Sequence, residues 1–168
     1  LIPAMHFNTR FISTTQQWFG GGMDVTQSKT DEIEKNNFHQ LLKKMCNRHN
    51  KSYYKKYKNL CDEYFYLPHR KEMRGIGGIF FDYKKDDFEK DFKFVRDVGV
   101  TFQKLFNKII RNKLRRKWTK KDKELQYIKR GRYAEFNLLY DRGTKFGLET
   151  GGNVEGILMS LPPLAKWK

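Results

Sequence analysis

A short segment near the start of the chain places three polar side chains where they could bind an anion. Polar and apolar residues alternate from Ala4 to Ile12, so His6, Asn8 and Arg10 share one face of a predicted strand. The alternate positions are largely apolar and are expected to face the core. At the strand rise, the row from His6 to Arg10 is roughly 13 Å long. An imidazole, an amide and a guanidinium in one row suit a broad, negatively charged ligand.

The next segment is rich in glycine and ends in a carboxylate. If it is a strand, Trp18, Gly20, Gly22 and Asp24 share one face. Glycines in a strand give up packing and cost backbone entropy, and they occur where a ligand approaches the backbone closely. The alternative is a glycine-rich bulge or turn between two strands. The short polar link 13–16 favours a hairpin, which would set the polar row beside the glycines and make a shelf for a planar ligand.

The spacing of apolar residues, together with cap and breaker signals, predicts the elements that hold these two segments. In the first half of the chain we predict strands at 4–12 and 18–24, a helix capped by Ser28, a basic helix ending before Pro68 and a strand at 75–82. A helix at about 86–113, which Gly99 could break, and a short helix capped by Thr119 follow. The last part is predicted to hold a strand at 132–140, a turn at 141–144, a loop at 151–153 and a strand at 154–161. This order indicates an α+β fold with a mostly antiparallel sheet covered by helices.

Composition limits the classes of partner. The 168 residues carry a net charge of +16, concentrated in Lys43–Lys58 and Lys104–Arg130, which favours nucleic acid, an anionic membrane surface or an acidic small molecule. These basic residues alternate with helical apolar positions, so they are expected to be solvated helix faces. The two cysteines, Cys46 and Cys61, lack zinc-site spacing and are expected to be buried, reduced thiols. The sequence has no apolar run of about 18 residues, so it predicts no membrane span.

Taken together, several strings resemble one family, the oxygen-dependent coproporphyrinogen III oxidases of haem biosynthesis. The matching strings are HFNTRF, WFGGGMDVT, HRKEMRGIGGIFFD, RGRYAEFNLLYDRGTKFGL and ILMSLPPLAKW, in family order from residue 6 to 167. The resemblance implies a single domain, 1–168, that is the C-terminal portion of a large, flat, roughly seven-stranded sheet with helices on both sides. It also implies a homodimer, with contacts in the region 133–167.

The same resemblance implies an activity. Two propionates of coproporphyrinogen III would be oxidatively decarboxylated to vinyl groups, giving protoporphyrinogen IX with molecular oxygen as co-substrate and no metal or organic cofactor. The substrate is broad and carries several carboxylates, as the polar row and the glycine shelf suggest.

Site residues follow by motif. Asp24 matches the family aspartate that binds pyrrole N–H groups, and His6 matches the proposed proton donor, a role that imidazole suits near neutral pH. Asn8, Thr9 and Arg10 match a substrate-contacting triplet, in which Arg10 would pair with a propionate. His6, Asp24 and Arg10 are therefore the predicted catalytic set.

A second set of contacts is predicted further along the chain. Gly151, Gly152 and Asn153 match a substrate-contacting loop, and Arg74 is a candidate for another carboxylate. Asn153 stands where the family pattern has arginine, which would remove one carboxylate contact.

Two rival functions stay open at this point. A nucleic-acid-binding module would need aromatic side chains among the basic ones on one exposed face. A catalytically inactive member of the family is suggested by Asn153. The resemblance favours the enzyme, with no nucleic-acid partner and no membrane span. The expected location is the cytoplasm, with the mitochondrial intermembrane space or a plastid as alternatives.

Overall fold

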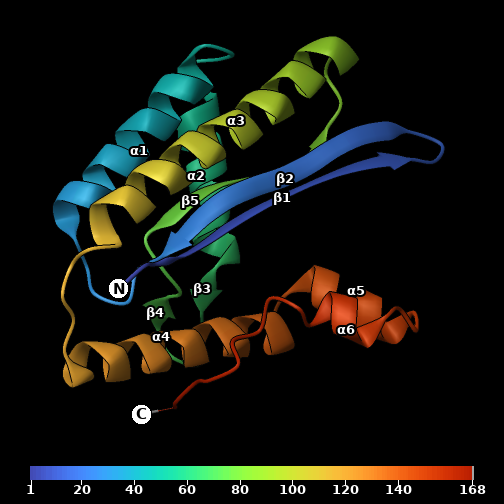
Figure 1. Ribbon diagram of the computed structural model, residues 1–168. Helices are drawn as coiled ribbons and strands as arrows, with labels where there is room; N and C mark the ends of the chain where they lie inside the picture. The colour runs from blue at the N-terminus through green and yellow to red at the C-terminus, as the bar shows by residue number, and fades with distance from the viewer. Residues whose placement is uncertain (168) are drawn as a thin grey trace.

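The computed structural model describes residues 1–167 and has an antiparallel sheet between two groups of helices (Figure 1). Its elements are β1 (Ala4–Ser13), β2 (Gln17–Thr26), α1 (Glu32–Asn47), α2 (Tyr53–Tyr64), β3 (Tyr66–Leu67), β4 (Glu72–Met73), β5 (Gly77–Lys84), α3 (Phe88–Lys113), α4 (Lys120–Leu139), α5 (Arg142–Glu149) and α6 (Val154–Ile157). Strands β1, β2 and β5 form the main sheet in that order, and β3 pairs with β4 in a small second sheet. The predicted α+β class with helices on both sides is confirmed.

The predicted hairpin is present, and its register puts the polar row beside the glycines. In the antiparallel β1–β2 pair, His6 faces Asp24, Asn8 faces Gly22 and Arg10 faces Gly20. Because side chains alternate along a strand, these residues lie on the same side of the sheet.

The glycines of β2 also serve the sheet itself. A Cβ atom at Gly22 would lie 2.4 Å from the backbone oxygen of Ile79 on β5, so only glycine lets the two strands approach this closely. The β2–β5 register shifts between Phe19 and Gly21, which is the irregularity expected of a bulge. The segment is therefore a glycine-rich strand, as predicted, that also contains the bulge of the alternative interpretation.

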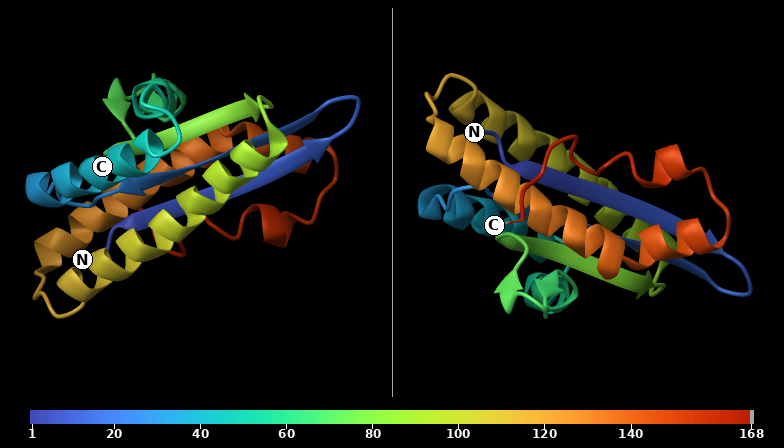
Figure 2. Two further views of the ribbon diagram at one scale, coloured as in Figure 1. Left: turned by 90° about the horizontal axis from the view of Figure 1, so that it is seen from above. Right: turned by 90° about the horizontal axis from the view of Figure 1, so that it is seen from below.

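The main core lies on the side of the sheet that faces α1 and α3. There Phe7 stacks on Phe102 of α3, with ring centroids 5.4 Å apart. The largest fully buried side chains of this core come from the sheet, α1 and α3: Met23, Ile79, Phe81, Phe38, Leu42, Met45, Phe94 and Val98. Figure 2 shows α1 and α3 running across this face, while α4 lies on the opposite one. Most of the apolar helix positions are thus confirmed as core, although Leu41, Leu60, Phe88, Phe92 and Phe106 are exposed. Both cysteines are free and buried.

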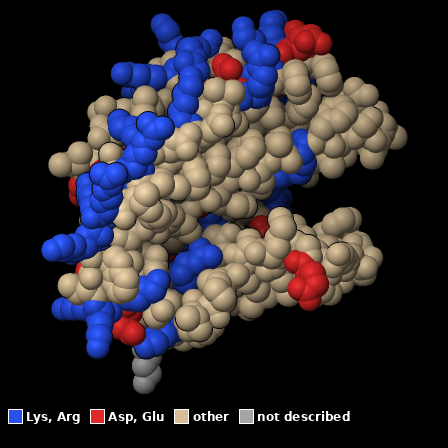
Figure 3. Space-filling model, in the orientation of Figure 1, with Lys and Arg blue, Asp and Glu red and all other residues tan. Residues whose placement is uncertain are grey.

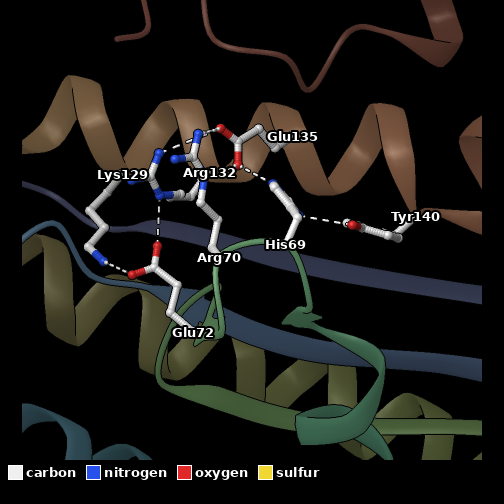
Figure 4. Close-up of polar contacts among 7 residues, drawn as sticks. All are labelled: His69, Arg70, Glu72, Lys129, Arg132, Glu135 and Tyr140. Carbon is white, nitrogen blue, oxygen red and sulfur yellow. Dashed lines mark hydrogen bonds and ion pairs between the residues drawn. The ribbon is translucent and has the colours of Figure 1, made fainter. Parts of the chain in front are cut away.

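A smaller core and a polar network attach α4 to the other side. Phe80 and Phe136 are buried together with residues at the end of α2. Nearby, Glu135 accepts hydrogen bonds from His69 at 2.8 Å and from Nε of Arg70 at 3.0 Å (Figure 4). Arg132 donates to Glu72 at 2.7 Å. These contacts fix the β3–β4 hairpin against α4, and so set the distance between α4 and the sheet.

Two predicted strands near the C-terminus are wrong. Residues 132–139 continue α4, which begins at the predicted Thr119 cap, a capping box in which Thr119 and Asp122 bond each other's backbone N–H, but is 20 residues long instead of short. The predicted strand at 154–161 is instead α6, followed by turns. The predicted turn at 141–144 is the first turn of α5, capped by Asp141.

Two smaller predictions also differ from the structure. The N-cap of α1 is Asp31, three residues after the expected Ser28, because the Asp31 carboxylate accepts from the backbone N–H of Glu34 at 3.0 Å. Gly99 does not interrupt α3, where it faces the ring of Phe7 from β1.

Candidate active site

A cleft of about 710 Å³ lies between the polar side of the sheet and the helices α4, α5 and α6. Figure 3 shows a hollow between the upper and lower parts of the molecule, with Lys and Arg side chains and an acidic side chain at its edge. The sheet forms the floor of the cleft through β1, β2 and β5. The opposite side, the helical wall, comes from α4, α5 and the segment around α6. The site is therefore a slot with a flat floor, which suits a broad ligand.

The predicted row lies along the floor of this cleft. His6, Asn8, Arg10 and Trp18 all line it. Thr9 does not, because strand alternation turns it to the opposite face, where it is exposed. Of the predicted triplet, the structure brings Asn8 and Arg10 to the cleft and leaves Thr9 outside it.

Asp24 lies beneath the floor and is only 4% exposed. One carboxylate oxygen, Oδ1, accepts from Nη2 of Arg74, and the other, Oδ2, lies 3.3 Å from Nδ1 of His6. Burial alone would raise the pKa of Asp24, but the Arg74 guanidinium and the His6 hydrogen bond outweigh it and hold the pKa below its ordinary value. Asp24 is thus an ionised carboxylate that fixes both an arginine and the histidine that faces the ligand space.

Arg74 is almost fully buried, at 2% exposure, yet touches the cleft. Its guanidinium lies 3.9 Å from the ring centroid of Phe65 and 4.8 Å from that of Phe136, so it is stacked between aromatic side chains. The structure places this residue, a candidate for a carboxylate of the ligand, as the counterion of Asp24.

Arg10 reaches across the glycine shelf to β5. Its Nη2 lies 2.9 Å from Oδ1 of Asp82, and Nη2 of Arg142, from α5, donates to Oδ2 of Asp82 at 3.4 Å. A Cβ atom at Gly20 would lie 2.7 Å from both Nε of Arg10 and Oδ1 of Asp82. Glycine at this position therefore makes room for the ion pair, which links the floor of the cleft to its helical wall.

The predicted loop at 151–153 is a loop, but it does not line the cleft. Gly151 has a positive φ of 70°, and Gly152 donates to the backbone oxygen of Gly147 at 2.9 Å. The Asn153 side chain caps α6 by accepting from the N–H of Glu155 at 3.0 Å. In this structure these three residues shape the α5–α6 connection instead of facing His6 and Arg10.

Sequence reasoning missed one cleft residue of the sheet, Asp82 on β5, and the residues of the helical wall. Asp82, Asn137 and Arg142 all line the cleft. Asp82 could have been found, because it falls on the same face of β5 as Phe80 and needed only the β2–β5 pairing to meet Arg10. Asn137 and Arg142 could not, since residues 132–140 were assigned to a strand and Arg142 to a turn.

Neither a metal cluster nor a membrane span emerges within the described residues. No group of three or more His, Cys, Asp or Glu side chains in 1–167 is arranged to hold a metal ion. Over the same residues, no helix combines the length and the apolar character needed to cross a bilayer.

The fold and the cleft define an α+β protein with a broad, cation-walled ligand site on the open face of an antiparallel sheet. Comparison with known proteins is consistent with this class: the family model "Coproporphyrinogen III oxidase" matches residues 1–168. The chain therefore belongs to the coproporphyrinogen III oxidase family.

Individual relatives agree with the family match. The chain is 59% identical over 168 residues to an oxygen-dependent coproporphyrinogen-III oxidase of Rickettsia bellii, and 58% identical to that of Rickettsia akari. In both comparisons the match covers 99% of this chain and 60% of the relative, so the chain spans about 60% of the length of these curated proteins.

Proposed function

We propose that the protein carrying this chain catalyses the oxygen-dependent decarboxylation of coproporphyrinogen III to protoporphyrinogen IX, a step in haem biosynthesis. The observation that carries the proposal is the cleft itself. Its floor presents His6, Asn8 and Arg10 in one row over an ionised Asp24, in a member of the coproporphyrinogen III oxidase family.

The balance of the reaction sets what these residues must do. Each propionate loses carbon dioxide and the equivalent of a hydride from the carbon next to the ring, which leaves a vinyl group. Oxygen takes the two electrons and, with one added proton, becomes hydrogen peroxide. The protein must therefore hold a large tetracarboxylate in place, keep a charge near the pyrrole nitrogens and supply a proton.

Arg10 is the residue that we assign to a substrate propionate. Its guanidinium already pairs with a carboxylate, with 2.9 Å between Arg10 Nη2 and Asp82 Oδ1, so the same guanidinium geometry can bind a carboxylate of the ligand. Asn8 lies next to it in the row and offers an amide to the same ligand.

His6 and Asp24 are assigned to proton handling. His6 is partly exposed to the cleft and lies 3.3 Å from Asp24 Oδ2, so the carboxylate orients the ring. When His6 gives up its contact, Oδ2 of Asp24 is free to accept a pyrrole N–H. Arg74 keeps the carboxylate ionised throughout by binding Oδ1. Molecular oxygen is the co-substrate, and we propose no metal or organic cofactor.

We further propose a homodimer and a cytoplasmic location. Large apolar side chains stay exposed along the C-terminal region that the family pattern assigns to subunit contacts, which supports the dimer. The most exposed of them are Leu138, Leu139, Phe146, Val154, Met159, Leu164 and Trp167. The bacterial origin of the relatives supports the cytoplasm.

The test is turnover by the full-length protein that carries these residues. Coproporphyrinogen III is supplied with and without oxygen, and protoporphyrin is read by fluorescence after oxidation. We expect product only with oxygen, with one hydrogen peroxide for each carbon dioxide released. Product without oxygen, or peroxide without carbon dioxide, would refute the proposed reaction. Binding of the porphyrinogen without turnover would indicate the catalytically inactive family member instead.

A further inference from the structure

One polar side chain of the helical wall is buried and has no partner. Asn137 of α4 is 8% exposed and lines the cleft opposite the sheet. Its side-chain nitrogen Nδ2 is inaccessible and makes no hydrogen bond within residues 1–167. The amide lies one helical turn after Tyr133 on α4, and Asp141, the N-cap of α5, follows four residues later; both also line the cleft.

An unpaired amide in this position is costly. Burying an amide without a hydrogen bond costs roughly 1–3 kcal/mol, and asparagine is also a poor residue for a helix interior. Other buried polar side chains in the same region keep at least one partner, Arg74 with Asp24 and Glu135 with His69 and Arg70, although Nε of Arg74 is itself unpaired within residues 1–167. Leucine, which has the same number and branching of side-chain heavy atoms, would avoid the cost at Asn137. An asparagine with no partner in the wall of a ligand cleft is therefore best explained by a ligand that supplies one.

The surroundings indicate which group the amide meets. Three arginines, Arg10, Arg74 and Arg142, and two carboxylates, Asp82 and Asp141, line the same cleft, so its charge favours an anionic ligand. Asp82 already shows a carboxylate held between two of these arginines. An N–H of Asn137 is a donor, and a carboxylate oxygen is the acceptor that such a cleft would receive.

We propose that Asn137 is a substrate-binding residue: its side-chain amide turns Nδ2, which is inaccessible in this structure, toward the cleft and donates a hydrogen bond to a carboxylate oxygen of the substrate. This inference rests on the proposed function, and it adds the helical wall to the binding site formed by the sheet. The substrate is then held from both sides, by Arg10 on the floor and by Asn137 on the wall.

The experiment compares Asn137→Leu and Asn137→Asp with the wild type in the full-length protein. The measurements are the Kd for coproporphyrin III, a stable tetracarboxylate, KM and kcat for coproporphyrinogen III, and Tm. For Asn137→Leu we expect Kd and KM to rise about tenfold while Tm is unchanged or higher, because the variant loses an unpaired amide in the free protein. Asn137→Asp should weaken binding further, since it sets a carboxylate against a carboxylate. Asn107→Leu, the same change at an exposed position of α3, should leave all values unchanged.

The outcomes separate this inference from the proposed function. A wild type that neither binds nor converts the porphyrinogen overturns both. If the wild type is active and Asn137→Leu lowers Tm while Kd stays within twofold, the amide has a structural role and the inference is wrong. Tighter binding by Asn137→Asp would show that the ligand presents a donor there, which overturns the assignment to a carboxylate.

Discussion

The buried guanidinium of Arg74 donates a hydrogen bond to Oδ1 of Asp24, a residue 50 positions earlier in the chain. The pair joins the segment before β5 to the floor of the cleft. Both residues are buried, with Arg74 2% and Asp24 4% exposed. Removing one partner leaves an uncompensated charge in the interior, whereas removing both does not.

Arg74→Met should therefore destabilise the protein by roughly 3–5 kcal/mol, because Asp24 loses its counterion. The double variant Asp24→Asn with Arg74→Met should recover a large part of that loss. Urea unfolding of the full-length protein measures both values. A loss below about 1 kcal/mol for the single variant, or a double variant as unstable as the sum of the two single ones, would show that the pair is not coupled.

Gly22→Ala tests the role of glycine in the close approach of the strands. The new Cβ atom would meet the backbone oxygen of Ile79 at 2.4 Å, and backbone cannot move aside cheaply. We expect a loss of stability of about 1–3 kcal/mol or more, as for an overpacked core. Gly156→Ala is the matched control, since its Cβ would meet only the Asn153 side chain, at 4.0 Å. Equal Tm values for the two variants would contradict the close β2–β5 pairing.

Stability should fall in acid because two buried carboxyl groups have lowered pKa values. Burial alone would raise the pKa of Asp24, but Arg74 and His6 outweigh burial and lower it. The hydrogen bond from Arg70 is the main cause of the lowered pKa of Glu135. A group with a lowered folded pKa contributes its full stability above the unfolded value, near 4, and loses it as the pH falls towards the folded value. Tm should thus be steady above about pH 5.5 and decrease steeply below about pH 4.5.

Replacing one of the two groups tests that assignment. Glu135→Gln should lower Tm at pH 7 and flatten its decrease in acid, because the carboxylate that titrates is gone. An unchanged acid slope would show that other groups are responsible.

The alternation of polar and apolar residues along single strands was enough to predict the hairpin and the cleft floor. His6, Asn8 and Arg10 face Asp24, Gly22 and Gly20 as the period of two requires. The helical wall was not predictable in this way, because residues 132–140 also alternate in part, and local pattern alone favoured a strand. What decides the helix is its start at the Thr119–Asp122 capping box and the burial of Phe136 against Phe80 and Phe65, a tertiary contact.

The exposed C-terminal apolar residues give a prediction about assembly. If they form the proposed dimer contact, Leu139→Glu, at a position that is 50% exposed, should shift the full-length protein from dimer to monomer in sedimentation velocity. Ile33→Glu on α1, where the native side chain is 78% exposed, is the control and should leave the dimer intact. A dimer that survives Leu139→Glu but not Ile33→Glu would place the contact on the other side of the molecule.

The cleft floor carries the proposed chemistry, and His6→Gln tests this assignment most directly. Glutamine can keep the contact to Asp24 but cannot transfer a proton at neutral pH. Aerobic turnover of coproporphyrinogen III should fall by about 100-fold or more in kcat, with the Kd for coproporphyrin III nearly unchanged. His49→Gln, the same change at the contact to Asp97 outside the cleft, should retain turnover. A His6→Gln protein that turns over at the wild-type rate would contradict the account.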